Sequence, residues 1–217
     1  MKNTFVAGIH AVGKSYLCGR AAASGWVHSS ASTLIKQELG GANWTGAKLV
    51  DDPDRNQKAL IAAVQRINAD GQRLLLDGHF VLRDASDKFV FLGADVFADR
   101  NQKALIAAVQ RINADGQRLL LDGHFVLRDA SDKFVFLGAD VFADLNLAAV
   151  VLIEASASLI AERLQSRDGV ARRVSDIEEF QLAERQQAET VCAALMLELT
   201  VLNAPTDEQF LAALGNS

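Results

Sequence analysis

Two spacings of apolar residues succeed one another along the chain. Short apolar runs predict buried strands, and apolar residues three or four positions apart predict helices with one buried face. The runs that predict strands are residues 4–7, 26–29, 73–77, 148–154 and 199–203. The stretches that predict helices are residues 14–24, 32–39, 56–69, 157–166, 175–197 and 206–214. Because strands alternate with helices, we expect an α/β fold in which helices cover both faces of a parallel sheet.

Local signals mark some of the element ends. Asp70-Gly71 is a stop signal for the helix that precedes it. Ser175 with Glu178 has the pattern of a capping box, so we expect the long helix to begin there. Residues 87–93 suit a small β excursion outside the main sheet.

A verbatim repeat changes this picture. Residues 55–99 (copy one) recur without a change as residues 100–144 (copy two), head to tail. Natural repeats drift apart, and stable repeat arrays generally need three or more units. Removing 45 of the 217 residues leaves 172, which suits a small single domain. We therefore expect one domain over residues 1–217, in which one copy of a helix and strand is a redundant insertion.

Composition narrows the class of partner and the compartment. Half of the residues are hydrophobic and 23% are charged, as in ordinary globular proteins. The formal net charge is −5 and there is no basic block, so we expect no nucleic acid partner. No apolar run reaches about 18 residues, so we expect no membrane association. The two cysteines, Cys18 and Cys192, lack metal-type spacing, which favours a reducing, cytoplasmic setting.

The chemistry centres on residues 8–15 (the phosphate loop), which read Gly-Ile-His-Ala-Val-Gly-Lys-Ser between a predicted strand and a predicted helix. This spacing is typical of phosphate-binding loops, because glycines let backbone N–H groups approach phosphates at a helix N-terminus. Lys14 would reach the β- and γ-phosphates of ATP, and the Ser15 hydroxyl would bind Mg²⁺. The alternative is a glycine turn without a ligand. The residues expected to contact ATP are Gly8, Ile9, His10, Ala11, Val12, Gly13, Lys14 and Ser15.

Together with three further stretches, this loop resembles the adenylate-kinase-like, nucleoside-monophosphate-kinase group of phosphate-loop kinases. Residues 30–36, Ser-Ala-Ser-Thr-Leu-Ile-Lys, are similar to the family's Ser-Thr-Gly-Asp-Leu-Leu-Arg. The resemblance implies that Ser30 and Lys36 contact the phosphoryl acceptor. Ser32 replaces the family's Gly and Lys36 its Arg, and a lysine is a point charge rather than a bidentate fork. Lys36 also suits a solvated helix face.

The third stretch occurs twice, at residues 75–81 and 120–126. It reads Leu-Leu-Asp-Gly-His-Phe-Val and looks like the family's Leu-Leu-Asp-Gly-Phe-Pro-Arg at the end of a central strand. The resemblance implies that Asp77 or Asp122 holds Mg²⁺ or orients the acceptor at the carboxyl edge of the sheet.

Two departures from the family pattern follow each of these aspartates. His79 and His124 would contact the substrate or transfer a proton, or would be structural residues at a strand end. Val81 and Val126 stand where the family has Arg, which leaves the identity of the acceptor open.

The fourth stretch contains four arginines. Arg163 and Arg167 are four residues apart on one predicted helix face, and Arg172 and Arg173 follow in a loop where the family has a mobile lid. Phosphoryl transfer needs cations around the transferred group, so all four are candidate catalytic residues. The alternative is a solvated basic helix end, where arginine is favourable in any protein.

The duplication supplies two aspartate strands for one loop. The copies are identical, so local propensities cannot choose between them, but copy two keeps its junction with Leu145, which favours copy two beside the first strand. The surplus copy carries the apolar stretches 74–76 and 89–92. We expect it to add to the sheet or to associate with another subunit, as in a homodimer.

Taken together, the motifs favour a small nucleotide or metabolite kinase that transfers the γ-phosphate of ATP, with Mg²⁺, to a small acceptor. The first alternative is a nucleotide-binding or nucleotide-hydrolysing switch, or a duplicated variant without efficient kinase turnover. A third interpretation is an interaction module that keeps the fold without turnover.

Overall fold

The computed structural model describes residues 3–22, 26–30, 73–77, 82–83, 89–90, 119–128, 131–143, 145–169 and 171–215, together with seven single residues. The single residues are 34, 37, 62, 63, 66, 110 and 114. For residues 73–77 the description covers the backbone.

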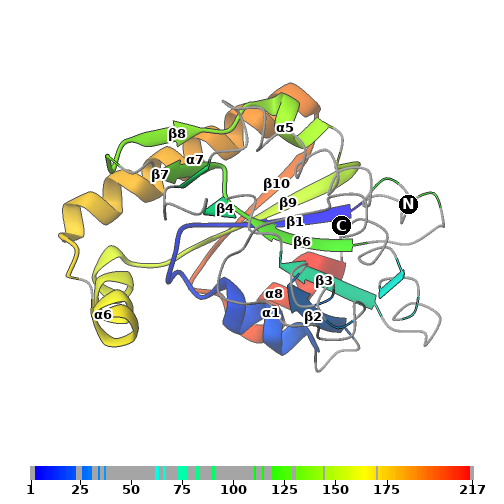
Figure 1. The fold of residues 1–217 in the computed structure, drawn as a ribbon, viewed down its shortest axis with the longest axis horizontal. Helices are drawn as coiled ribbons and strands as arrows, with labels where there is room; N and C mark the ends of the chain where they lie inside the picture. The colour runs from blue at the N-terminus through cyan, green and yellow to red at the C-terminus, as the bar shows by residue number, and fades with distance from the viewer. Residues whose placement is uncertain are drawn as a thin grey trace.

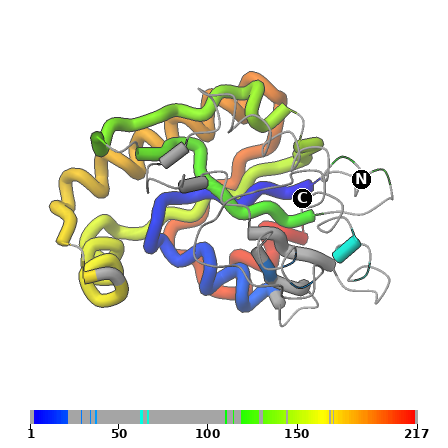
Figure 2. Tube along the Cα trace, in the orientation of Figure 1, coloured from blue at the N-terminus to red at the C-terminus, as the bar shows by residue number. Residues whose placement is uncertain are grey.

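A six-stranded parallel sheet lies at the centre of the molecule (Figure 1). Its strands lie in the order β10-β9-β1-β6-β3-β2, and each neighbouring pair is parallel. The strands are β1 (Asn3–Ala7), β2 (Trp26–Ser30), β3 (Arg73–Asp77), β6 (Leu119–Gly123), β9 (Leu147–Glu154) and β10 (Glu198–Asn203). In the tube drawing, β1 crosses the middle of the sheet in blue (Figure 2). The expected parallel sheet is confirmed.

Helices cover both faces of this sheet (Figure 1). The described helices are α1 (Lys14–Ala22), α5 (Ala139–Ala143), α6 (Ala157–Asp168), α7 (Val174–Leu195) and α8 (Asp207–Gly215). Buried side chains of α5 and of the C-terminal half of α7 pack on one face, and those of α1, α6 and α8, with Ile177 from the start of α7, pack on the other. None of the helices described is long and apolar enough to cross a membrane.

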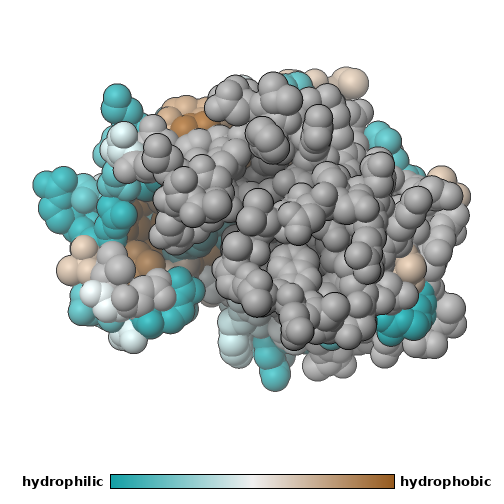
Figure 3. All heavy atoms as spheres, viewed as in Figure 1, coloured by the Kyte–Doolittle hydropathy of each residue, from teal (hydrophilic) through white to brown (hydrophobic). Residues whose placement is uncertain are grey.

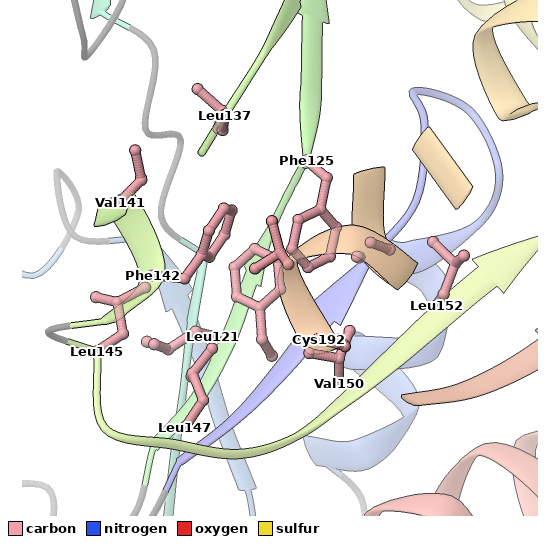
Figure 4. Close-up of a cluster of buried hydrophobic side chains, with 14 of the residues drawn as sticks. Leu121, Phe125, Leu137, Val141, Phe142, Leu145, Leu147, Val150, Leu152 and Cys192 are labelled. Atoms are coloured by element: carbon pink, nitrogen blue, oxygen red, sulfur yellow. The ribbon is translucent and has the colours of Figure 1, made fainter. Parts of the chain in front are cut away.

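Alternate residues of β1 enter the two resulting cores. Phe5 belongs to the core under α5 and α7, and Val6 belongs to the core under α1, α6 and α8, as the twofold side-chain period of a strand requires. In the first core the rings of Phe125 and Phe142 lie 4.6 Å apart between their centroids and point toward each other (Figure 4). Both faces of the central strands are therefore apolar, which explains their continuous hydrophobic sequence.

The strands of both copies lie in the same sheet. The copy-two strand β6 pairs with β1, and the copy-one strand β3 lies between β6 and β2. The two copies are in register, because Asp77 pairs with Asp122. Copy two therefore occupies the place beside β1, and copy one adds a strand to the sheet.

Each copy also has a short antiparallel pair outside the main sheet. In copy one, β4 (Leu82–Arg83) pairs with β5 (Phe89–Val90), which agrees with the excursion expected over residues 87–93. In copy two, β7 (Val126–Arg128) pairs with β8 (Phe134–Phe136). These hairpins directly follow the two Asp-Gly-His-Phe segments.

One predicted helix start is wrong. Helix α7 begins at Val174, and its N-cap is Arg173, which makes no side-chain capping bond. The Arg173 carbonyl already accepts the N–H groups of Asp176 and Ile177, so Ser175 lies inside the first turn and cannot cap it. The helices expected over residues 32–39, 56–69 and 101–114 lie mostly outside the described residues.

Candidate functional site

The phosphate loop leaves β1 and enters α1 through an unusual backbone path. Gly8, Ala11 and Gly13 have φ angles of 140°, 62° and 114°. A Cβ atom on Gly8 would lie 2.4 Å from the carbonyl oxygen of Ile153, so only glycine fits where the loop passes the end of β9. The left-handed angle at Ala11 is unfavourable for a residue with a side chain, at a cost of about 1 kcal/mol.

Lys14 lies between the loop and β6. Its Nζ donates a hydrogen bond to the Gly8 carbonyl and lies 3.8 Å from Oδ1 of Asp122. Both side chains are buried, with 8% of Lys14 and 5% of Asp122 exposed. Asp122 reaches this place because its backbone pairs with Val6, directly before the loop. The structure thus brings together one lysine and one of the two aspartates that the motifs identify.

A cavity of about 1000 Å³ opens above the loop. Figure 3 shows the molecule hollowed beside hydrophilic surface residues, with hydrophobic residues inside the hollow. The residues that line the cavity come from the loop, α1, the end of β6, α6 and the segment after β10. They are Ile9, His10, Ala11, Val12, Gly13, Lys14, Ser15, Tyr16, Leu17, Asp122, Gly123, His124, Arg163, Ser166, Arg167, Ala204 and Pro205.

This lining fits the phosphates of ATP. The N–H groups of Lys14 and Ser15 lie in the first turn of α1, where they have no acceptor within the helix. The Lys14 cation lies beside them, and the Ser15 hydroxyl is exposed toward solvent. Oriented N–H groups and a cation at a helix N-terminus favour anions.

The lining also fits Mg²⁺ bound together with phosphates. Among the described residues no group of three or more His, Cys, Asp or Glu side chains would hold a metal ion alone. Mg²⁺ typically takes one or two protein ligands and completes its shell with waters and substrate phosphates. Ser15 and Asp122 would be those protein ligands.

Two of the four candidate arginines contact the cavity. Arg163 on α6 donates through Nη1 to the carbonyl oxygens of Ala11 and Val12, at 3.2 and 2.8 Å. Arg167 follows one turn later and also lines the cavity. Helix α6 therefore brings positive charge to the open side of the loop.

The other two arginines contact aspartates instead. Arg172 donates to Oδ2 of Asp132 at 2.8 Å, and Arg128 lies 3.0 Å from the same atom. The hydrogen bond from Arg172 lowers the pKa of Asp132. Arg173 pairs with Asp176 at 2.8 Å at the start of α7. Neither Arg172 nor Arg173 lines the cavity, and their catalytic role stays a prediction.

His124 lies at the cavity wall beside the loop. Its ring centroid is 4.5 Å from that of His10, with the ring planes tilted by 48°. Nδ1 of His124 lies 4.0 Å from Oε1 of Glu184, which projects from α7. A histidine from the phosphate loop and a histidine from the end of β6 thus lie beside each other in the cavity lining.

Glu184 is a site residue that the motifs do not indicate. Only 1% of it is exposed, and its carboxylate accepts hydrogen bonds from the backbone N–H groups of Phe125 and Val126. Burial raises the pKa of Glu184 to about 7, although those N–H groups, the Lys14 charge and the Gly8 N–H favour ionisation. The signal in the sequence is an acidic residue on the apolar face of α7, seven positions after buried Ile177 and seven before buried Val191.

Four candidate residues are described in part or not at all. Lys36 and His79 lie outside the described residues. Ser30 and Asp77 are placed by their backbone, in register with each other across β2 and β3. Val126, which stands where the resembled family has Arg, is fully buried.

Known proteins are similar to this chain over part of its sequence or in structure. A family model described as an AAA domain matches residues 92–181, less than half of the chain and beyond the phosphate loop. No curated protein matches the sequence. A sugar kinase from Janibacter sp. is similar in structure at 14% identity and a TM-score of 0.43, covering 100% of this chain and 93% of its own. A gluconokinase from Sinorhizobium meliloti is similar at 16% identity and a TM-score of 0.41, covering 99% of this chain and 92% of its own.

Proposed function

We propose that this protein is an ATP-dependent kinase of a small molecule, which transfers the γ-phosphate of ATP to a small acceptor. The observation that carries the proposal is the burial of Lys14 between the Gly8 carbonyl and the Asp122 carboxylate. A lysine in this place, at the start of a helix and beside a strand-end carboxylate, is suited to hold the β- and γ-phosphates.

In this proposal the residues of the cavity have different roles in phosphoryl transfer. Backbone N–H groups at the start of α1 bind the phosphates, and Ser15 and Asp122 hold Mg²⁺. Mg²⁺, when bound, neutralises charge on the phosphate oxygens. Arg163 and Arg167 supply further positive charge from α6. Phosphoryl transfer asks the protein mainly for positioning and charge stabilisation, and these groups provide both.

Two histidines are candidates for contact with the phosphoryl acceptor. His124 and His10 line the cavity and offer hydrogen bonds to an acceptor hydroxyl or phosphate. Ser30, Lys36, His79 and the alternative Mg²⁺ ligand Asp77 remain predictions for this side. An adenylate-kinase-like nucleotide acceptor and a sugar-like metabolite both agree with a kinase of this kind.

A nucleotide-hydrolysing switch is the second candidate function. The buried Val126 favours this function. The resembled family has an arginine at this position, and without it the phosphate of an acceptor nucleotide would lack one binding partner. In that case water would take the place of the acceptor.

The expected partners and location are also proposals. We propose a cytoplasmic protein without a nucleic acid partner, and a homodimer formed through parts of copy one other than β3, because β3 already has a strand on each side. The homodimer would appear as doubled mass in light scattering. A clean monomer would exclude it.

The proposed function is tested by substitution of the lysine. Lys14→Ala should weaken ATP binding and lower ADP release about a hundredfold or more, because it removes the cation that lies between the loop and Asp122. Wild type, Lys14→Ala and the control Lys133→Ala, an exposed lysine between β7 and β8, would be assayed with ATP, Mg²⁺ and a panel of sugars, nucleosides and nucleotides.

The pattern of turnover separates the candidates. ADP release that rises with one class of acceptor supports the kinase, and slow release that ignores acceptors supports the switch. Unchanged ATP binding by Lys14→Ala would show that the phosphate loop is not the nucleotide site.

A further inference from the structure

Several polar side chains of helix α7 contact residues at the carboxyl edge of the sheet. Gln181 accepts the backbone N–H of Ala155 at 3.2 Å, just after β9. Arg185 donates through Nε to Glu154 at 2.7 Å, at the last residue of β9. This helix therefore does more than cover the sheet, because two of its side chains bind the end of β9 and the residue that follows it.

Glu184 lies between these two residues in the sequence and binds the backbone that follows β6. Its Oε2 accepts the Val126 N–H at 2.7 Å, and both of its oxygens lie 3.0 Å from the Phe125 nitrogen. Phe125 and Val126 follow Asp122 by only three and four residues. A carboxylate that fixes these two peptide groups also fixes the direction in which the strand end leaves the sheet.

The charges around Glu184 connect it with the phosphate loop. Lys14 lies near enough to favour the ionised form, and the Gly8 N–H does the same. His124 faces it from the end of β6, at 4.0 Å. One carboxylate from α7 thus holds the backbone that follows Asp122 and lies within electrostatic range of the phosphate loop.

The buried N–H groups of Phe125 and Val126 need a hydrogen-bond acceptor, but stability alone does not require that this acceptor be an ionisable carboxyl. A buried carboxylate is costly to desolvate, and an apolar core residue of similar size is often as stable or more so. A glutamate on this helix that binds the backbone directly after the cavity residues Asp122, Gly123 and His124 suggests a requirement of the site rather than of the core.

We propose that Glu184 is a positioning residue for phosphoryl transfer. It holds the backbone at Phe125 and Val126, and so sets the places of Asp122 and His124 relative to Lys14. The inference rests on the proposed kinase function, because positioning of Asp122 and His124 matters only if these residues take part in phosphoryl transfer.

The experiment compares wild type with Glu184→Gln and with Glu189→Gln, an exposed carboxylate on the same helix. Three quantities would be measured at pH 8: the Kd of ATP, the acceptor-dependent kcat, and the free energy of unfolding. Glu184→Gln should lower kcat about ten- to hundredfold, because small displacements of reacting groups have effects of this size. Its Kd for ATP should change less than about threefold, since the phosphate contacts of the loop remain. Glu189→Gln should match wild type in all three.

Amide hydrogen exchange gives a second, independent reading. Exchange over residues 119–128 should become faster in Glu184→Gln and stay unchanged in Glu189→Gln, because only the former replaces one of the two oxygens that accept the Phe125 and Val126 amides with an NH2 donor. If Glu184→Gln does not fold, Glu184→Asp replaces it. Aspartate keeps the charge but is one methylene shorter, so a similar loss of kcat would support positioning.

The outcomes separate this inference from the proposed function. Wild-type kcat in Glu184→Gln or Glu184→Asp would overturn the positioning role. A fall in kcat that matches a fall in the folded fraction would also overturn it, in favour of a structural role. A wild-type protein that neither binds ATP nor releases ADP would overturn the kinase proposal instead, while hydrogen exchange would still test whether Glu184 holds the strand end.

Discussion

The strands β3 and β6 come from identical segments, yet they have different neighbours. β6 lies against β1 and the phosphate loop, whereas β3 lies between β6 and β2. In the part of the chain that the structure describes, Asp122 of β6 lies within ionic distance of Lys14. The sequence of a segment thus determines that it forms a buried strand. Its neighbour in the sheet determines whether the aspartate at its end lies near the phosphate loop.

Contacts that occur once in the chain distinguish the two copies. Asn3 accepts the Leu119 N–H at 2.8 Å and donates to the Leu145 carbonyl at 2.8 Å, which ties the start of β6 to β1. Glu184 ties the segment after the end of β6 to α7. Because the chain has one Asn3 and one Glu184 in these places, only one copy can be held at both ends.

The largest expected effect comes from the paired aspartates. Asp122→Asn should lower ADP release about a hundredfold, as expected for the loss of one charge that acts on a transferred group. Asp77→Asn should stay within about threefold of wild type, because its strand has β6 and β2 as neighbours rather than β1. The measurement is kcat with saturating ATP for both variants.

Two results would contradict the assignment of the site aspartate to copy two. Equal losses in the two variants would mean that both carboxylates serve the site. A loss confined to Asp77→Asn would mean that copy one lies beside β1 in solution.

A smaller effect concerns the pH dependence of stability. The pKa of Glu184 is about 7 in the folded protein and is expected near 4.5 in the unfolded chain. Between these values the folded state retains a proton that the unfolded state has lost, so the free energy of unfolding should fall as the pH rises. This group alone would lower it by about 3 kcal/mol between pH 4.5 and pH 8.

Denaturant unfolding of wild type and Glu184→Gln over this pH range measures the effect. The glutamine variant should lack this part of the pH dependence, and Glu189→Gln should retain it. Parallel curves for wild type and Glu184→Gln would mean that the carboxyl is not buried against copy two as the structure has it.

The smallest effect is expected from removal of a copy. Deletion of residues 55–99 and deletion of residues 100–144 give the same 172-residue chain, since the copies are identical. We expect its Kd for ATP to stay within about threefold of the full-length value, because the remaining copy can take the contacts of β6 with β1, Asn3 and Glu184. Loss of ATP binding in this shorter chain would show that both copies are needed for the site.

The sequence is sufficient to predict the strands of the main sheet, the helices α1, α6, α7 and α8, and the phosphate loop, whereas the short helix α5 is missed. The correct predictions depend on local signals: apolar runs for β1, β6 and β9, and the glycine spacing around Lys14. The start of α7 is predicted wrongly at Ser175, because a capping pattern is local and the path of the chain before a helix is not.

Other parts of the site depend on contacts between distant residues. Glu184 and Phe125 are 59 positions apart, and Arg163 and Ala11 are 152 apart. No local pattern specifies such pairs. The choice between Asp77 and Asp122 is of the same kind, since identical segments differ only in what surrounds them.

The place of β3 in the interior of the sheet has a consequence for how such a chain tolerates a large insertion. The edge strands of the sheet are β2 and β10, and neither belongs to a copy. The added strand therefore creates no new row of unpaired backbone groups, the feature that makes sheet edges prone to aggregation. A parallel sheet can in this way grow from its middle, keeping both borders and the loop beside β1 as they were.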